Sequence, residues 1–470
     1  MLLYRKQKRL KWLEVVDMDR PILTELILEE SKKSPRVESG LFDNVRNLAM
    51  YPENRESLNL GGYFIAKTHE KLEELIVHAH FERLDDRSPT RSDVSIREMN
   101  DTAINPGLLS RSLFVHFLPF GSCTPFQHLT SLRLHRISLR HCADTWCKFI
   151  DFHKIKRLRL YHCPAADSLL GQLSKANSLP KALRVLELQH KDNRENEALV
   201  ALDGLLCLLS GLTILTIDLQ NVKSLPDVAG IVRHGKTLEQ LNVHCSDESP
   251  LPLLSDMHCE AEEHVFDTED FDKICSATSK LEQLSCAWPG RSLIRFPSND
   301  WLTFENSASK LWTLVTLQIT TWPCNKPGKM QLTRPVYEQL LQGVSTHLFE
   351  SVTNRSWPVL PPGWPEQVVV TGDEIVEIFP PSKLRLVVFG ISDKIYERQD
   401  SQTQLLYIRS SAFDADGKSK VYAAPVGWCA RRFLEPRSEI LEFVLSRHSR
   451  LPSRGGDMES RFGFNVDDEL

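Results

Sequence analysis

The chain has 470 residues, more than a single compact core usually contains, so it must either divide into domains or extend as an array of repeats. Hydrophobic residues make up 41% and charged residues 25%, values typical of soluble globular proteins, and the formal net charge is -5. Because there is no basic excess, we expect neither a nucleic acid nor an anionic membrane as a partner.

The N-terminal segment is positively charged but lacks the apolar run and cleavage site of a secretory signal. We therefore expect a cytoplasmic or nuclear protein whose 11 cysteines stay reduced. One stretch, 198–219, is apolar for the length of a membrane span, but it contains Asp203 and is interrupted by Ser210 and Gly211. A helix that ends near Gly211, followed by a buried strand, explains this stretch better.

An apolar triplet with the spacing L-x-x-L-x-L recurs along the chain, and this spacing is the strand signature of leucine-rich repeats. The most regular copies start 26, 28, 29 and 26 residues apart, at Leu129, Ile155, Leu183, Leu212 and Leu238. Other copies start at Leu10, Val45, Leu72, Leu281, Leu314 and Leu384. Chance alone, or a doubly wound sheet, rarely repeats one strand motif at such constant spacing.

Several intervals between copies are longer than one repeat. Those from Leu238 to Leu281 and from Leu281 to Leu314 predict insertions, the first of them in the acidic stretch 246–272. The interval from Leu72 to Leu129 has 57 residues, about two repeats. It predicts one degenerate unit around residues 112–120 (SLFVHFLPF) and a polar surface excursion over 82–105.

Within each copy, alternation should point the last two apolar residues inward and the intervening residues outward. Segments between the copies, such as 198–210 and 336–347, have apolar residues at helical spacing, so each unit is predicted as strand, turn and helix. We therefore expect an α/β fold over residues 1–350. It is an irregular leucine-rich-repeat solenoid with a curved parallel sheet and helices on its convex side.

The C-terminal part departs from this spacing. Residues 351–382 are rich in Pro and Trp and predict a connecting loop. Residues 383–451 predict a small α+β cap, with a strand at 383–391, a hairpin that turns at Asp414-Ala415-Asp416-Gly417, and a helix at 437–447. Such a cap would cover the open end of the repeat core, and the tail 452–470 is predicted to be disordered.

Four His-Cys dipeptides raise the possibility of a zinc site; they start at His141, His162, His244 and His258. Paired zinc ligands usually lie two to four residues apart, whereas these dipeptides are separated by whole repeats. Cys163 follows Leu160 by three residues, where a leucine-rich repeat places Cys or Asn to support the turn. We therefore expect no metal.

Other motifs for chemistry are incomplete. Asp414, Asp416 and Gly417 resemble a fragment of a calcium loop, but the later acidic ligands are missing. The sequence has no glycine-rich phosphate loop, no G-x-S-x-G elbow and no H-E-x-x-H helix. We expect neither a cofactor nor an enzymatic activity, and an enzyme with a site in 351–470 remains the alternative.

The outward residues of the strands are the predicted partner-binding positions, and they change from basic to mixed or acidic along the array. An exposed strand face must be polar in any case, so solvation alone is the alternative explanation. The positions are Arg133, His135, Arg157, Arg159, Tyr161, Glu187, Gln189, Thr216, Asp218, Gln240, Asn242 and His244.

The phrases NVRNLAMYPEN, LTSLRLHRI, IKRLRLYHC and VYEQLLQGV resemble the degenerate leucine-rich repeats of fungal F-box proteins, over residues 10–345. The resemblance implies that the repeats capture a protein to be ubiquitinated. In that family an N-terminal F-box docks the Skp adaptor of a cullin-based ubiquitin ligase. Here the only F-box-like phrase, 20–28, lies between two triplets, and a repeat helix entered through Pro21 explains it more simply.

The sequence therefore favours a protein-interaction module, the substrate-recognition part of an F-box-type ubiquitin-ligase receptor that has lost or lacks its F-box. We expect the Skp adaptor as a partner only if an F-box exists upstream. An array that starts at Leu10 without a capping element predicts that Met1 is an internal start or that the gene model is truncated. A free-standing repeat scaffold with no ubiquitin role is the other alternative.

Overall fold

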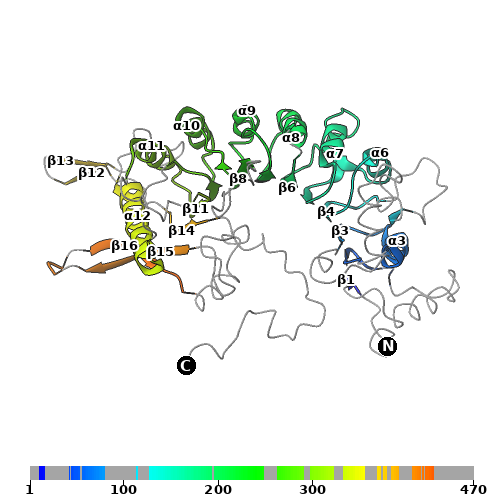
Figure 1. Ribbon diagram of the computed structural model, residues 1–470, viewed down its shortest axis with the longest axis horizontal. Helices are drawn as coiled ribbons and strands as arrows, with labels where there is room; N and C mark the ends of the chain where they lie inside the picture. Colours follow the sequence, from blue (N-terminus) through cyan, green and yellow to red (C-terminus); the bar gives the residue numbers. More distant parts are fainter. Residues whose placement is uncertain are drawn as a thin grey trace, which may run out of the picture.

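Strands and helices alternate along the chain and build one open, mostly parallel sheet with helices along one face (Figure 1). In the described part of the chain, thirteen strands form a single path in the order β1 to β8, β10, β11 and β14 to β16, and β9 pairs with β8 outside this path. The computed structural model describes residues 10–15, 42, 44–52, 55–79, 113–114, 126–192, 195–247, 262–289, 297–321, 332–354, 368–371, 374–377, 383–390, 405–413, 415–417 and 419–427.

The parallel strands are β1 (Trp12–Val15), β2 (Asn47–Met50), β3 (Glu74–His78), β4 (Ser131–His135), β5 (Arg157–Tyr161), β6 (Val185–Lys191), β7 (Ile214–Gln220), β8 (Gln240–Asp247), β10 (Gln283–Cys286), β11 (Thr316–Ile319) and β14 (Leu386–Phe389). The antiparallel strands are β9 (Glu262–Glu263), β15 (Leu405–Phe413) and β16 (Ser419–Pro425), and a separate pair consists of β12 (Val368–Thr371) and β13 (Glu374–Glu377).

The helices are α3 (Arg55–Thr68), α6 (Ala143–Phe149), α7 (Ala166–Leu173), α8 (Glu197–Leu208), α9 (Val228–Val232), α10 (Thr268–Ala277), α11 (Asn299–Ala308) and α12 (Arg334–Asn354), with a short 3-10 helix at Phe152–Lys154. Helices are about 10 Å wide, whereas strands are spaced about 4.8 Å apart. An array of such units therefore curves with its helices outside, as Figure 1 shows.

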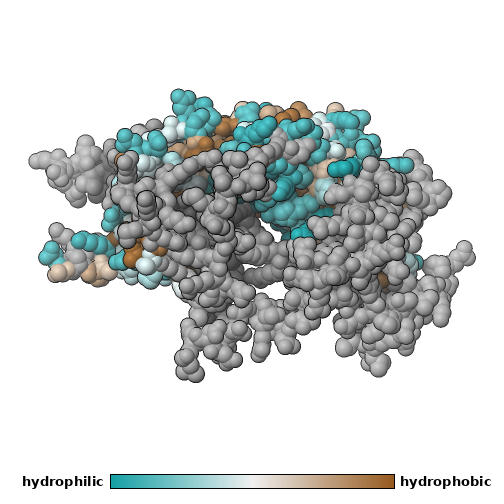
Figure 2. Space-filling view, viewed as in Figure 1, coloured by the Kyte–Doolittle hydropathy of each residue, from teal (hydrophilic) through white to brown (hydrophobic). Residues whose placement is uncertain are grey.

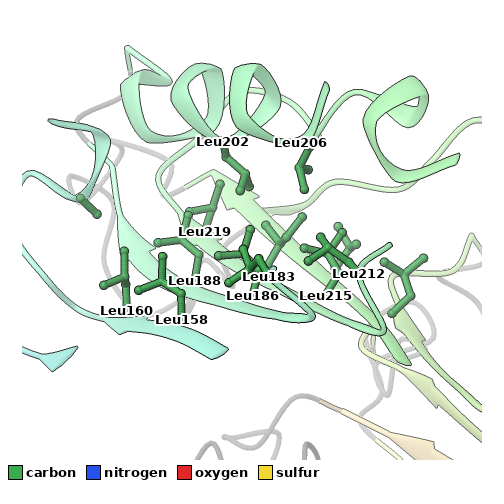
Figure 3. Packing of buried hydrophobic residues seen from close by; sticks show 14 of the residues in the cluster. Leu158, Leu160, Leu183, Leu186, Leu188, Leu202, Leu206, Leu212, Leu215 and Leu219 are labelled. Carbon is green, nitrogen blue, oxygen red and sulfur yellow. The ribbon is translucent and has the colours of Figure 1, made fainter. Parts of the chain in front are cut away.

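The predicted triplets are confirmed as strands, and the strands share one register. The middle residue of each triplet faces the middle residue of the next, as Leu132 faces Leu158 and Leu158 faces Leu186. The same alignment extends from Leu13 in β1 to Val387 in β14. These side chains belong to one continuous buried core, in which leucines of α8 point towards leucines of β5, β6 and β7 (Figure 3).

The apolar stretch 198–219 is confirmed as a helix followed by a strand. α8 ends at Leu208, Gly211 has a φ of 82°, and β7 begins at Ile214. A side chain at Gly211 would also meet the guanidinium of Arg184, which donates a hydrogen bond to the Gly211 carbonyl. Among the described residues, no helix combines the length and the apolar character that a membrane span requires.

Two expectations were wrong. β3 pairs directly with β4, so the interval from Leu72 to Leu129 adds no strand to the sheet and the degenerate unit is not part of it. Instead, Leu113 and Phe114 are buried, and the Phe114 ring stacks on Phe149 with centroids 4.5 Å apart. Residues 351–382 are not only a loop, because α12 continues to Asn354 and β12 pairs with β13.

The C-terminal hairpin is confirmed where the sequence predicted it. β15 and β16 pair on either side of the turn, in which Gly417 has a φ of 75°. The Tyr407 hydroxyl donates to the Glu338 carbonyl of α12 at 2.8 Å, so the hairpin is held against the last helix. Tyr407 and Ala423 lie in the same core as the leucines. The predicted helix 437–447 and the tail 452–470 lie outside the described residues.

Removal of a central core side chain should destabilise the array strongly. Leu186 is fully buried, so Leu186→Ala should lower the free energy of unfolding by about 2–5 kcal/mol in urea denaturation. The control is Val200→Ala on α8, where the side chain is 66% exposed and little change is expected. Equal losses in the two variants would contradict the assigned register.

Asp203 on α8 should make stability depend on pH. Burial raises its pKa to about 6, above the unfolded value of 3.8, so the ionised carboxylate destabilises the fold above a pH of about 6. The penalty declines as the pH falls below about 6 and is gone below the unfolded pKa. Asp203→Asn should therefore melt at a higher temperature than the wild type at a pH of about 7.5, and the difference should shrink below a pH of about 6 and vanish only below the ordinary Asp pKa of 3.8.

The amide oxygen of this variant can still accept the hydrogen bond from the Asp227 backbone. The exposed Asp144 of α6 provides the control Asp144→Asn. A constant difference in melting temperature between Asp203→Asn and the wild type at every pH would exclude a contribution from the ionisation of Asp203.

Candidate binding face on the inner side of the sheet

Strand alternation places all the predicted partner-binding residues on the face of the sheet opposite the helices, which we call the inner face. They form three rows that cross the strands. The first row contains Arg157 and Gln240. The second contains Arg133, Arg159, Glu187, Thr216 and Asn242, and the third contains His135, Tyr161, Gln189, Asp218 and His244.

The part of the inner face formed by β4, β5 and β6 is charged and only partly buried, with Arg157 as its exposed side chain. Arg159 Nε donates to Glu187 Oε1 at 2.8 Å, and the Tyr161 hydroxyl donates to the same carboxylate. Arg157 lies 3.7 Å from Glu74, and its side chain is 46% exposed. Arg159 and Glu187 thus face each other on neighbouring strands, whereas Arg157 reaches across β4 to Glu74 on β3. Hydrophilic residues gather on this side around β4 and β6 (Figure 2).

From β7 onward, the inner face is polar but buried. The Asp218 carboxylate accepts from Gln189 Nε2 at 2.8 Å and lies 2.7 Å from His244 Nδ1. Asn242, which is 0% exposed, donates to Thr216 Oγ1 and accepts from Gln283 Nε2, both at 3.1 Å. These polar side chains therefore bond to one another. On an exposed strand face they would instead bond to water.

The same pattern continues through β10, β11 and β14. Ser285 Oγ donates to Gln318 Oε1 at 2.7 Å, and Gln318 Nε2 donates to the Gly390 carbonyl at 2.8 Å. Both side chains are buried. Beyond them the inner face becomes apolar, where Leu386, Val388 and Leu406 form a small separate cluster.

Glu263 was not predicted as part of this face. It lies in β9, which pairs antiparallel with the end of β8. Its Oε1 is 3.2 Å from His244 Nε2, a distance that suits an ion pair, and its Oε2 accepts from Thr320 Oγ1 at 2.9 Å. His244 therefore lies between two carboxylates. No periodic signal marks Glu263, because it belongs to an insertion between two triplets.

At the N-terminal end of the inner face, aromatic rings follow one another across β2 to β5. Ring centroids are 5.7 Å apart between Tyr51 and His78, 3.7 Å between His78 and His135, and 6.3 Å between His135 and Tyr161. The Arg133 guanidinium lies 5.1 Å from the centre of the Tyr161 ring, within cation–π range. We call these five residues the aromatic-cation cluster.

Tyr51 and His78 were missed by the sequence prediction, although a signal for them existed. Each follows the last apolar residue of its triplet by one position, as His135 and Tyr161 do. The prediction used only the regular copies of the repeat, which begin at Leu129. Extension of the same offset to the two upstream copies would have found both residues.

The protonation states in the cluster follow from burial. Burial lowers the pKa of His135, and nearby His78, Arg136, His162 and Arg133 lower it further, so the ring is neutral at physiological pH. Burial and the Glu14 carboxylate raise the pKa of Tyr51 to about 12. Burial and Glu187 also raise the pKa of Tyr161. Both phenols therefore keep their protons and donate hydrogen bonds to carboxylates.

Among the cysteines of the His-Cys dipeptides, Cys163 has a structural role. The Cys163 thiol is buried and donates to the Leu134 and Tyr161 carbonyls at 3.5 Å, which ties the ends of β4 and β5. Burial raises its pKa to about 12, so it stays protonated. Within the described ranges, no group of three or more His, Cys, Asp or Glu side chains is arranged to hold a metal ion. His258 and Cys259 lie outside those ranges.

Comparisons of the chain with protein-family models, with curated proteins and with solved structures returned no match. Function must therefore be inferred from the residues of this chain and their arrangement. Two features of the inner face are relevant, namely its charged, partly exposed part on β5 and β6 and the aromatic-cation cluster beside it.

The Asp218 carboxylate should contribute to the stability of the fold, unlike a carboxylate on the surface. Asp218→Ala would leave Gln189 and His244 without their shared acceptor, which should cost about 1–3 kcal/mol in the free energy of unfolding. Urea denaturation would measure this loss against Asp144→Ala, which removes an exposed carboxylate from α6. Indistinguishable stabilities of the two variants would mean that the network contributes nothing.

Proposed function

We propose that this chain is a leucine-rich-repeat protein that captures a protein partner on the exposed part of its inner face. Its triplets recur every 26 to 29 residues in the regular part of the array, and its strands are stacked in one register. Such arrays present long, continuous faces, which repeat proteins use to bind other macromolecules. The resemblance of the repeats to those of fungal F-box proteins supports a role as the substrate-recognition part of a ubiquitin-ligase receptor.

The observation that carries the proposal is the contrast between the two parts of the inner face. On β7 and β8, Asp218 and Asn242 are buried and bonded to their neighbours. On β5 and β6, the charges of Arg157, Arg159 and Glu187 lie on side chains that solvent reaches. Charged residues at an accessible surface guide partner selection and association more than they add affinity.

Reversal of one exposed charge on this face should weaken partner capture. Arg157→Glu should reduce the recovery of bound protein severalfold in quantitative affinity purification of the full chain, because the arginine is 46% exposed on β5, the middle strand of the three. Lys175→Glu is the matched control, since it makes the same charge change beside α7 on the helix side. Crosslinking should place the partner within reach of β4 to β6.

Partners retained equally by both variants would contradict capture by this face. The ubiquitin role is decided by a second readout in the same experiment. Recovery of Skp and cullin with the wild type and with both variants would support a ligase receptor, because the adaptor is not expected to bind the inner face. Recovery of other partners without Skp and cullin would instead support a free-standing scaffold.

A further inference from the structure

Arg133 differs from the other arginines of the inner face. Arg157 approaches Glu74 and Arg159 is bonded to Glu187, so each has an acidic neighbour across the sheet. Arg133 faces Arg159 on one side and Ile76 on the other. Among the described residues, no carboxylate lies within ion-pair distance of its guanidinium, whose one close partner is the face of the Tyr161 ring. Its five N–H donors are therefore available.

His135 provides a second, independent observation in the same cluster. Its side chain lies two residues further along β4, and the residue is only 5% exposed. The Nδ1 atom is buried and makes no hydrogen bond within the described part of the chain. Buried polar atoms are nearly always bonded, so an exception calls for an explanation such as a missing ligand. A neutral imidazole can offer an N–H at this position.

Among the described residues, the ionisable groups that act on His135 are all cationic or neutral. The groups that face His135 are His78 from β3, Arg133 from its own strand, and Arg136 and His162 from the turns that follow β4 and β5. The hydroxyls of Tyr51 and Tyr161 already donate to Glu14 and Glu187. In the part of the chain that the structure describes, no negatively charged hydrogen-bond acceptor binds Arg133 or His135.

We infer that the aromatic-cation cluster recognises a carboxylate, and that its source is an Asp or Glu side chain in an extended acidic segment of the protein partner. The Arg133 guanidinium would bind the carboxylate through parallel N–H donors while Tyr161 holds the guanidinium plane. His135 would donate from Nδ1 to the second side of the same group. This inference rests on the proposed capture of a protein by the inner face and adds the chemistry of the segment captured.

A peptide assay with the purified full chain tests this. The probe is a capped hexaglutamate peptide labelled for fluorescence anisotropy, with a hexaglutamine peptide as its neutral counterpart. The wild type should bind the first and not the second. Arg133→Gln should lower the affinity about tenfold or more, since a charge-assisted pair is lost. His135→Phe keeps the stacked ring but removes the donor, so a smaller, severalfold loss is expected.

A lysine control separates this site from general attraction. Lys175→Gln on the helix side should change the affinity by less than about threefold, because an exposed charge far from the site contributes little. Melting temperatures of all variants should stay near that of the wild type. Because His135 is neutral, affinity should also be similar between a pH of about 6.5 and about 8.

Three outcomes would overturn the inference. The first is no binding of hexaglutamate by the wild type, and the second is equal loss in Arg133→Gln and Lys175→Gln. The third is binding of a phosphoserine peptide without any binding of hexaglutamate, which would make phosphate the ligand. Failure of partner capture by the exposed face would leave a positive peptide result standing, and a negative peptide result would leave capture elsewhere on that face possible.

Discussion

The common register of the inward leucines is the constraint on which the rest of the structure depends. Leu132, Leu158 and Leu186 face one another on adjacent strands, and the same alignment continues from β1 to β14. A slip of one residue between two strands would turn the apolar side chains of one strand out of the core and bury its charged ones. One register therefore produces both the continuous core and the polar rows on the opposite face.

Those polar rows are governed by the spacing between strands. Equivalent residues of neighbouring units lie about 5 Å apart, so each outward side chain contacts the one before it and the one after it. Arg159 with Glu187, and Asp218 with His244, are direct results of this arrangement. The inner face is thus not a set of independent surface residues. It is a series of ladders in which a charge is stable if its neighbour complements it.

The strands, their register and the C-terminal hairpin could be predicted because each depends on local spacing, as in the triplet of Leu183 or the turn at Gly417. The burial of Asn242 could not, because it depends on contacts between units and on the polar partners that those units supply. Glu263 was missed because an insertion brings it to His244. The prediction of a repeat unit near Phe114 was wrong, because apolar content alone does not distinguish a strand from a buried turn.

The ladders also indicate where a partner can gain most from binding. On β7 and β8, a ligand group would have to replace hydrogen bonds that Asp218 and Asn242 already make, so the exchange would yield little net free energy. At Arg133 and His135 no such bonds are lost, and an unsatisfied buried atom gains a partner. Most of the free energy for recognition of an acidic group is therefore available at the N-terminal end of the inner face, beside the exposed charges of β5 and β6.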